Sequence, residues 1–160
     1  MITPPTIIDE HRQSYEEATK RFPDTYQAIL STCPDFYLVE EDPTEWMMTR
    51  AFLKLCRHRM TKHSRLHIND VTQAIESPEE GLETKYVHFA LVVLAGLDLG
   101  FSFRHDPTKV IIGNSLNIRR SVFNHAVKFW AAILRNRDLS IEYGWNGAQR
   151  VWGQHTSTTK

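Results

Sequence analysis

Residues 89–97 are Phe89-Ala-Leu-Val-Val-Leu-Ala-Gly-Leu97, the most apolar stretch of the chain, and Asp98 ends it. Nine residues are about half of the ~18 needed to span a bilayer, so this stretch is predicted to be buried core and not a membrane segment. Extended back to about Glu83, it predicts a helix that is apolar on nearly every side. Such a helix belongs in the middle of a domain. The chain is therefore expected to fold around a helix over 83–97.

Start and stop signals for further helices flank this segment on both sides. Asp42, Pro43 and Glu45 form the clearest start, because a capping residue is followed by proline at the first helical position and by an acid three residues after the cap. Helices are predicted over 9–22, 25–31, 43–62, 69–76, 83–97 and 115–135. Short strands at 100–104 and 109–113, on either side of a turn at 105–108, predict a hairpin over about 100–112, and 139–143 is a possible extra strand. The expected class is mainly α, a compact domain of five to six helices with a small β-hairpin.

The length and composition favour one soluble domain. At 160 residues a single core can bury roughly two thirds of the surface that the unfolded chain exposes, so we predict one domain over 1–152 and a flexible polar tail over 153–160. Cys33 and Cys56 stand outside any Cys-x-x-Cys spacing, which predicts neither a disulfide framework nor a zinc ribbon. A reducing intracellular compartment, cytoplasm or nucleus, is the simpler expectation, because the N-terminal residues lack the features of a signal peptide.

The formal charge of zero conceals four blocks of alternating sign. Residues 1–45 carry three basic and ten acidic side chains, a net charge of −7, and residues 46–69 carry six basic and no acidic side chains, a net charge of +6. Residues 70–100 follow with −5 and residues 101–160 with +6. Such blocks can neutralise one another within a fold or between copies, or leave a basic face for an anionic partner.

A basic stripe is predicted along the 43–62 helix. Its members fall within one arc of about 140° when the helix advances 100° per residue; they are Arg50, Lys54, Arg57, His58 and Lys62. Side chains at these spacings could contact successive phosphates of a nucleic acid. The alternative is a solvated face whose charges pair with the acidic blocks.

Two further groups are candidates for binding. Arg119 and Arg120 fall in the first turns of the 115–135 helix, where positive charge opposes the helix dipole, so they need a bound anion or an ion pair with the acidic N-terminal block. Trp145, Arg150 and Trp152 stand in a short glycine-containing segment that could anchor a partner or stack on bases, or pack as a terminal arm onto the domain.

The run from Ser64 to Ile75 (Ser-Arg-Leu-His-Ile-Asn-Asp-Val-Thr-Gln-Ala-Ile) follows the long basic helix. It resembles the junction between the second and third helices of histone-fold proteins. It is equally similar to the entry of a winged helix, in which 69–76 would be the second helix, 83–97 the third and 101–112 the wing. These resemblances cover about a dozen residues and imply no functional residues.

No motif fixes a reaction or a ligand. The nucleotide-binding and nucleophile-elbow signatures are absent from the sequence. His105-Asp106 superficially resembles the paired metal ligands of metal-dependent phosphohydrolases, but that resemblance implies a pair on a helix, whereas Pro107 implies a turn here. We therefore expect no catalytic residues, no metal and no cofactor. The leading hypothesis is a non-catalytic interaction or assembly protein that contacts a protein partner or itself through its charge blocks and C-terminal tryptophans. Nucleic-acid binding through the 43–62 helix is the alternative, and a small enzyme with a site near His88 and His105 is the third.

Overall fold

The computed structural model describes residues 4–33, 43–57, 65–82 and 87–135. The helices are α1 (Pro4–Arg21), α2 (Pro23–Thr32), α3 (Thr44–Cys56), α4 (Ile68–Glu76), α5 (Phe89–Asp98) and α6 (Arg120–Arg135), and the strands are β1 (Leu66–His67) and β2 (Ser115–Leu116). This is the mainly helical class with a small antiparallel sheet that the sequence predicts. No helix in these ranges combines the length and apolar character needed to cross a membrane.

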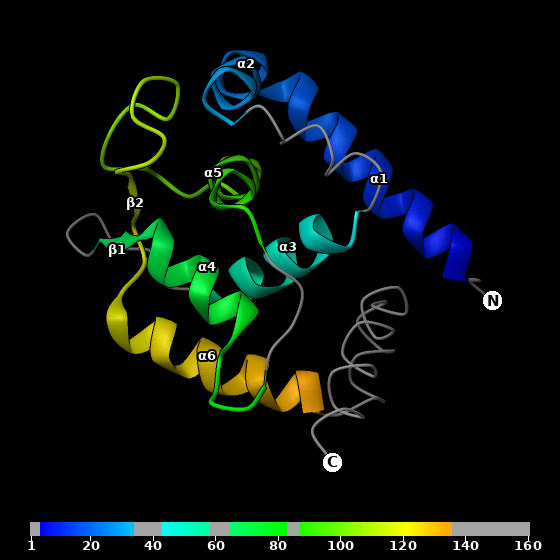
Figure 1. Ribbon diagram of the computed structural model, residues 1–160, viewed down its shortest axis with the longest axis vertical. Helices are drawn as coiled ribbons and strands as arrows, with labels where there is room; N and C mark the ends of the chain where they lie inside the picture. The colour runs from blue at the N-terminus through cyan, green and yellow to red at the C-terminus, as the bar shows by residue number, and fades with distance from the viewer. Residues whose placement is uncertain (1–3, 34–42, 58–64, 83–86, 136–160) are drawn as a thin grey trace.

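Helix α5 lies at the centre of the fold. Residues 90–96 are all buried, and α5 packs against α1, α2, α3 and α4, so that Figure 1 shows it nearly end-on among the other helices. Gly96 is required for this packing, because an added Cβ would lie 2.9 Å from the ring of Phe103 and 3.0 Å from Leu116. Gly100, with φ of +90°, follows the end of α5 in the left-handed region that glycine adopts without strain.

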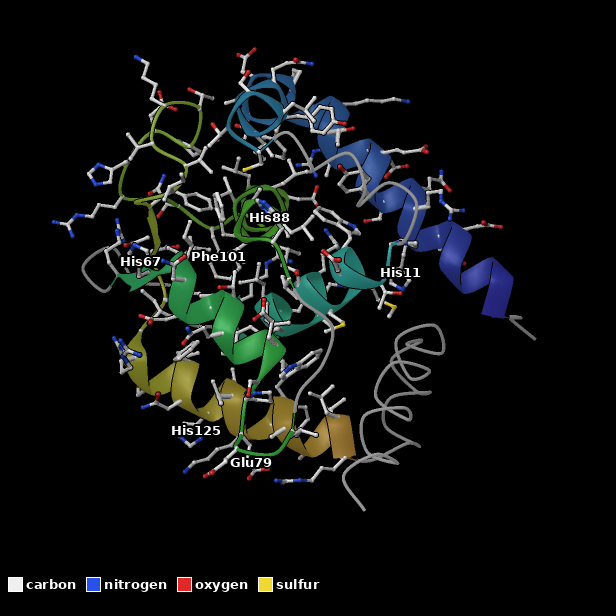
Figure 2. All side chains as sticks on the ribbon, in the orientation of Figure 1. His11, His67, Glu79, His88, Phe101 and His125 are labelled. Atoms are coloured by element: carbon white, nitrogen blue, oxygen red, sulfur yellow. The ribbon has the colours of Figure 1, made fainter. Side chains whose placement is uncertain are left out.

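Two histidines cap the helices that follow extended segments. The Nδ1 atoms of His67 and His88 each accept a hydrogen bond of 3.1 Å, from the backbone N–H of Asn69 at the start of α4 and of Ala90 at the start of α5 (Figure 2). This contact satisfies a backbone donor that the helix itself cannot pair. Helix α5 therefore begins at Phe89, later than the expected start near 83, because residue 88 is extended.

Other helix boundaries also differ from those expected. Helix α1 begins at Pro4 instead of position 9. Of the helix predicted over 43–62, α3 accounts for Thr44–Cys56, and positions 58–62 lie outside the described residues. The residues expected to open the last helix form β2 instead, so α6 begins at Arg120. For α1 and α6 the apolar periodicity extends beyond, or stops short of, the residues whose backbone is helical.

The small sheet lies at different residues from the 100–112 hairpin. Strands β1 and β2 pair antiparallel, with Leu66 opposite Leu116, and Phe103 forms an isolated bridge to Leu116. The buried Asn114 side chain closes the 104–113 loop. Its Oδ1 accepts a hydrogen bond from the backbone N–H of His105, and its Nδ2 donates one to the carbonyl of the same residue, both at 3.0 Å. The turn expected at 105–108 is present, with the backbone N–H of Thr108 donating to Asp106 Oδ1.

Helix α6 closes the other side of the core. Trp130 is fully buried, its ring meets that of Phe52 edge-on at 6.0 Å, and its Nε1–H donates to the carbonyl of Ile75 at 3.1 Å. One side chain therefore links α6 to both α3 and α4.

Candidate interaction sites

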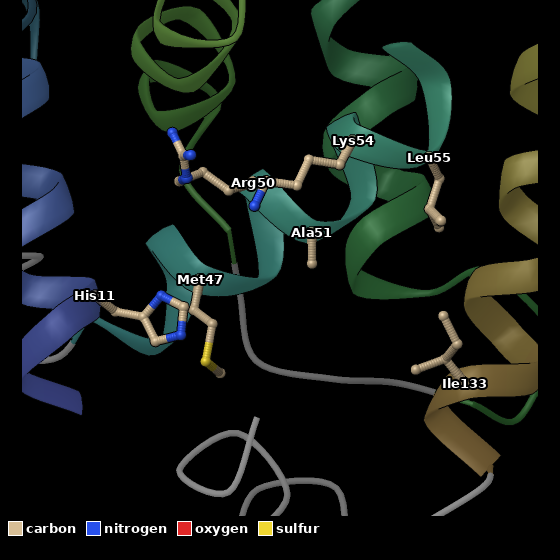
Figure 3. Close-up of a pocket in the computed structure, with 7 residues that line it drawn as sticks. All are labelled: His11, Met47, Arg50, Ala51, Lys54, Leu55 and Ile133. Carbon is tan, nitrogen blue, oxygen red and sulfur yellow. The ribbon is translucent and has the colours of Figure 1, made fainter. Parts of the chain in front are cut away.

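A hollow of about 150 Å³ opens where α1, α3 and α6 meet. Helix α3 supplies five of its lining residues, at spacings that place them on one side of that helix: Met47, Arg50, Ala51, Lys54 and Leu55. His11 comes from α1 and Ile133 from the end of α6. Figure 3 shows His11 and Met47 on one side, Leu55 and Ile133 on the other, and Ala51 between them. The hollow thus combines an apolar wall with three nitrogen-bearing side chains.

Positive charge exceeds negative charge around this hollow among the described residues. Arg50 forms an ion pair with Asp98 at the end of α5, and Arg21 of α1 donates to the other oxygen of the same carboxylate at 2.6 Å. The Arg50 guanidinium also lies 5.7 Å from the Trp46 ring. Lys54 adds a further cation that feels the charge of Asp98 but forms no ion pair with it among the described residues, so the cluster carries more positive than negative charge.

Burial and this positive field both act on His11. Desolvation, followed by the charges of Lys54 and Arg50, lowers the pKa of His11 from 6.5 to about 4. Desolvation and the neighbouring arginines Arg50 and Arg57 also lower the pKa of Lys54, although Asp98 opposes that change. His11 is therefore neutral at pH 7 and sits beside cations.

Acidification should destabilise the protein through His11. Its pKa in the folded state lies below its unfolded value, so the stability it contributes is complete above about pH 6.5 and is lost as the pH falls through about 4. We expect this loss to be about 1–2 kcal/mol after allowance for solvent screening of a partly exposed ring. Urea unfolding of His11→Gln from pH 7 to 4 should show a flatter pH dependence than the wild type. His125→Gln, an exposed substitution on α6, should retain the wild-type slope, and equal flattening in both variants would refute the assignment.

The structure places the members of the basic stripe differently. Arg50 and Lys54 both line the hollow, whereas Arg57 is exposed at the end of α3 and is not among the lining residues. His58 and Lys62 lie outside the described residues. The sequence pattern assigned no binding role to His11, because no local signal connects it to α3.

The two arginines before and at the start of α6 are exposed. Arg120 lies 3.8 Å from Asp70 of α4 and its guanidinium lies 5.5 Å from the Phe123 ring, while Arg119 is in no ion pair among the described residues. The acidic partner of Arg120 thus comes from the 70–100 block and not from the N-terminal block that the sequence suggested. Trp145, Arg150 and Trp152 lie outside the described residues.

The outward faces of α1 and α6 carry opposite charge. Four exposed acidic residues lie on α1 (Asp9, Glu10, Glu16 and Glu17), and the exposed cations Lys20 and Arg21 lie in its last turn, where Arg21 pairs with Asp98. The exposed side of α6 and the residue before it carry Arg119, Arg120, Lys128 and Arg135, of which Arg120 pairs with Asp70 and Arg135 with Glu79. Phe129, 46% exposed, adds an apolar side chain to the α6 face.

The histidines and cysteines that could act in catalysis or bind a metal lie in surroundings that do not favour either role. His88 caps α5, and the exposed His105 precedes the turn in which Asp106 accepts from Thr108. Burial raises the pKa of Cys33 and raises that of Cys56 to about 12, which disfavours a thiolate at either position. Among the described residues, no three His, Cys, Asp or Glu side chains gather as a metal site would require. Comparison with protein-family models, curated proteins and solved structures finds no match to this chain.

Proposed function

We propose that this protein is a non-catalytic assembly protein whose copies associate head to tail, the acidic face of α1 in one copy contacting the basic face of α6 in the next. The observation that carries the proposal is the opposite charge of these two exposed faces. They lie along different edges of the fold, with α3 and α4 between α1 and α6 (Figure 1). A contact between two different faces of the same chain is heterologous, so it can continue into a ring or a filament.

The ion pairs within one molecule leave both faces partly uncompensated. Among the described residues, Glu10 and Glu16 on α1 are in no ion pair, and neither is Lys128 on α6. Complementary faces of this kind speed association and fix the orientation of the partner more than they strengthen binding. Phe129 supplies the exposed aromatic group that protein interfaces favour.

The geometry supports nucleic-acid binding less well. Arg50, the first residue of the expected phosphate-binding stripe, forms an ion pair with Asp98, and its side chain is only 19% exposed. Helix α5 occupies the place of a recognition helix in the winged-helix comparison, but residues 90–96 have no exposed face to enter a groove. Both cysteines are free and buried, which supports a reducing intracellular location for the assembly.

Charge reversal on α6 tests the assembly. Wild-type protein should rise above its monomer mass of 18.6 kDa with concentration at low salt and return towards it at about 500 mM salt, measured by light scattering. Lys128→Glu should weaken association about tenfold, because attraction to α1 becomes repulsion. The double variant Glu17→Lys/Lys128→Glu should recover it.

Lys109→Glu is the matched control, since it makes the same charge change on the exposed 104–113 loop, away from α6. It should associate like the wild type. A wild-type protein that stays monomeric at low salt, or a Lys109→Glu variant as impaired as Lys128→Glu, would overturn the proposed interface.

A further inference from the structure

The hollow between α1, α3 and α6 has the composition of a small-molecule site. Its lining residues Met47, Ala51, Leu55 and Ile133 are apolar, and His11, Arg50 and Lys54 bring nitrogen atoms to the same space. A cavity of about 150 Å³ is large enough to hold a benzene-sized body. Pockets of mostly apolar lining with a few polar groups are where proteins bind small ligands.

The charges around the hollow select the sign of the ligand. The described charged groups that act on His11 are Lys54 and Arg50 of α3. The nearby carboxylate of Asp98 at the end of α5 is already shared by Arg50 and Arg21. An anion placed beside Lys54 would therefore meet a cation that no ion pair among the described residues engages.

We propose that this hollow binds a small organic monocarboxylate whose apolar body is about the size of benzene. The apolar body would lie against Ala51, Leu55 and Ile133, and the carboxylate would lie near Lys54 and His11. The negative charge would oppose the field that now disfavours protonation of His11, so binding and proton uptake by this imidazole would be coupled. This inference does not depend on the assembly proposal, because the hollow involves neither exposed helix face.

Four ligands of similar shape or charge test the proposal on the full-length chain. Benzoate should bind with a dissociation constant of about 1 mM, a value consistent with a ligand of this size. Benzamide lacks the charge, benzylamine reverses it and acetate lacks the apolar body, so each should bind at least about tenfold more weakly. Calorimetry gives the affinities, and NMR shift changes at His11 and Ile133 give the position.

Three variants separate the contributions to binding. Lys54→Gln should weaken benzoate binding about tenfold, whereas Lys109→Gln, which removes an exposed cation from the 104–113 loop outside the hollow, should leave it unchanged. Ala51→Leu should reduce binding by filling the hollow without changing any charge. An NMR titration should also show the pKa of His11 rising when benzoate is bound.

The alternative results are equally specific. Equal affinity for benzoate and benzamide would refute the role of charge, and benzoate binding without shifts at His11 and Ile133 would place the ligand elsewhere. No benzoate binding by the wild type would reject the site itself. None of these results bears on light-scattering evidence for assembly.

Discussion

Trp130→Ala is expected to lower the free energy of unfolding by about 3–5 kcal/mol, the range measured for truncation of a buried aromatic side chain. The Trp130 side chain is fully buried, packs edge-on against Phe52 and donates a hydrogen bond to the carbonyl of Ile75. The substitution therefore creates a cavity between α3, α4 and α6 and removes a hydrogen bond at once. Domains of this size are stable by only about 5–15 kcal/mol, so the variant should unfold at a much lower urea concentration.

The neighbouring residue supplies the matched control. Phe129 stands beside Trp130 on α6 but is 46% exposed, so Phe129→Ala should cost less than about 1 kcal/mol. Trp130→Phe retains an aromatic ring and loses the Nε1–H donor, which predicts an intermediate loss of about 1–2 kcal/mol. Urea unfolding at low protein concentration measures all three variants. Equal losses for Trp130→Ala and Phe129→Ala would contradict the orientation of α6.

The central helix could be predicted because its signal is local. An apolar run over 89–97 that ends at a charged residue indicates burial whatever surrounds it, and the structure buries residues 90–96 and leaves Phe89 and Leu97 partly exposed. The sheet could not be predicted, because Leu66 pairs with Leu116 across fifty positions of the chain. The pattern at 100–112 indicated extended residues correctly at Phe103, but only the folded chain determines that its partner is Leu116.

The same difference between local signals and contacts across the chain applies to the candidate sites. Helical spacing placed Arg50 and Lys54 on one side of α3, and both line the hollow. The other groups around them come from other helices. His11 of α1 and Ile133 of α6 also line the hollow, and Asp98 of α5 pairs with Arg50. Tertiary packing brings them together, and no spacing rule within one helix encodes it.

The structure also shows where the charge blocks meet. Arg50, Arg120 and Arg135 each pair with an acid from the 70–100 block: Asp98, Asp70 and Glu79 respectively. Of the exposed acids of α1, Asp9 pairs instead with Arg12 of the same helix. Among the described residues, these arginines therefore pair with the second acidic block, and the proposed assembly assigns the remaining acids of α1 to a contact with a second copy.

Asp98→Ala should have the second largest effect, a loss of about 2–3 kcal/mol in the free energy of unfolding. The Asp98 side chain is 11% exposed and accepts from both Arg21 and Arg50. Its removal leaves the mostly buried guanidinium of Arg50 close to Lys54 without this counter-ion, and an uncompensated buried charge costs more than the ion pair itself contributes. The position is otherwise unfavourable for an acid, because Asp98 ends α5 at the negative pole of the helix dipole. The arginines, not the helix, must therefore stabilise the carboxylate.

A double-mutant cycle distinguishes the two arginines. Arg50 is 19% exposed and Arg21 is 60% exposed, so the coupling of Asp98 with Arg50 should be about 1–3 kcal/mol and its coupling with Arg21 below about 1 kcal/mol. Asp98→Asn should lose less than Asp98→Ala, because the amide oxygen still accepts a hydrogen bond in the same volume. The cycle needs five variants, measured by thermal and urea unfolding: Asp98→Ala, Arg21→Ala, Arg50→Ala and the two double variants that combine Asp98→Ala with either arginine substitution. A coupling with Arg21 as large as that with Arg50 would mean that solvent exposure does not decide the strength of this network, because both arginines bind the same carboxylate and differ chiefly in exposure.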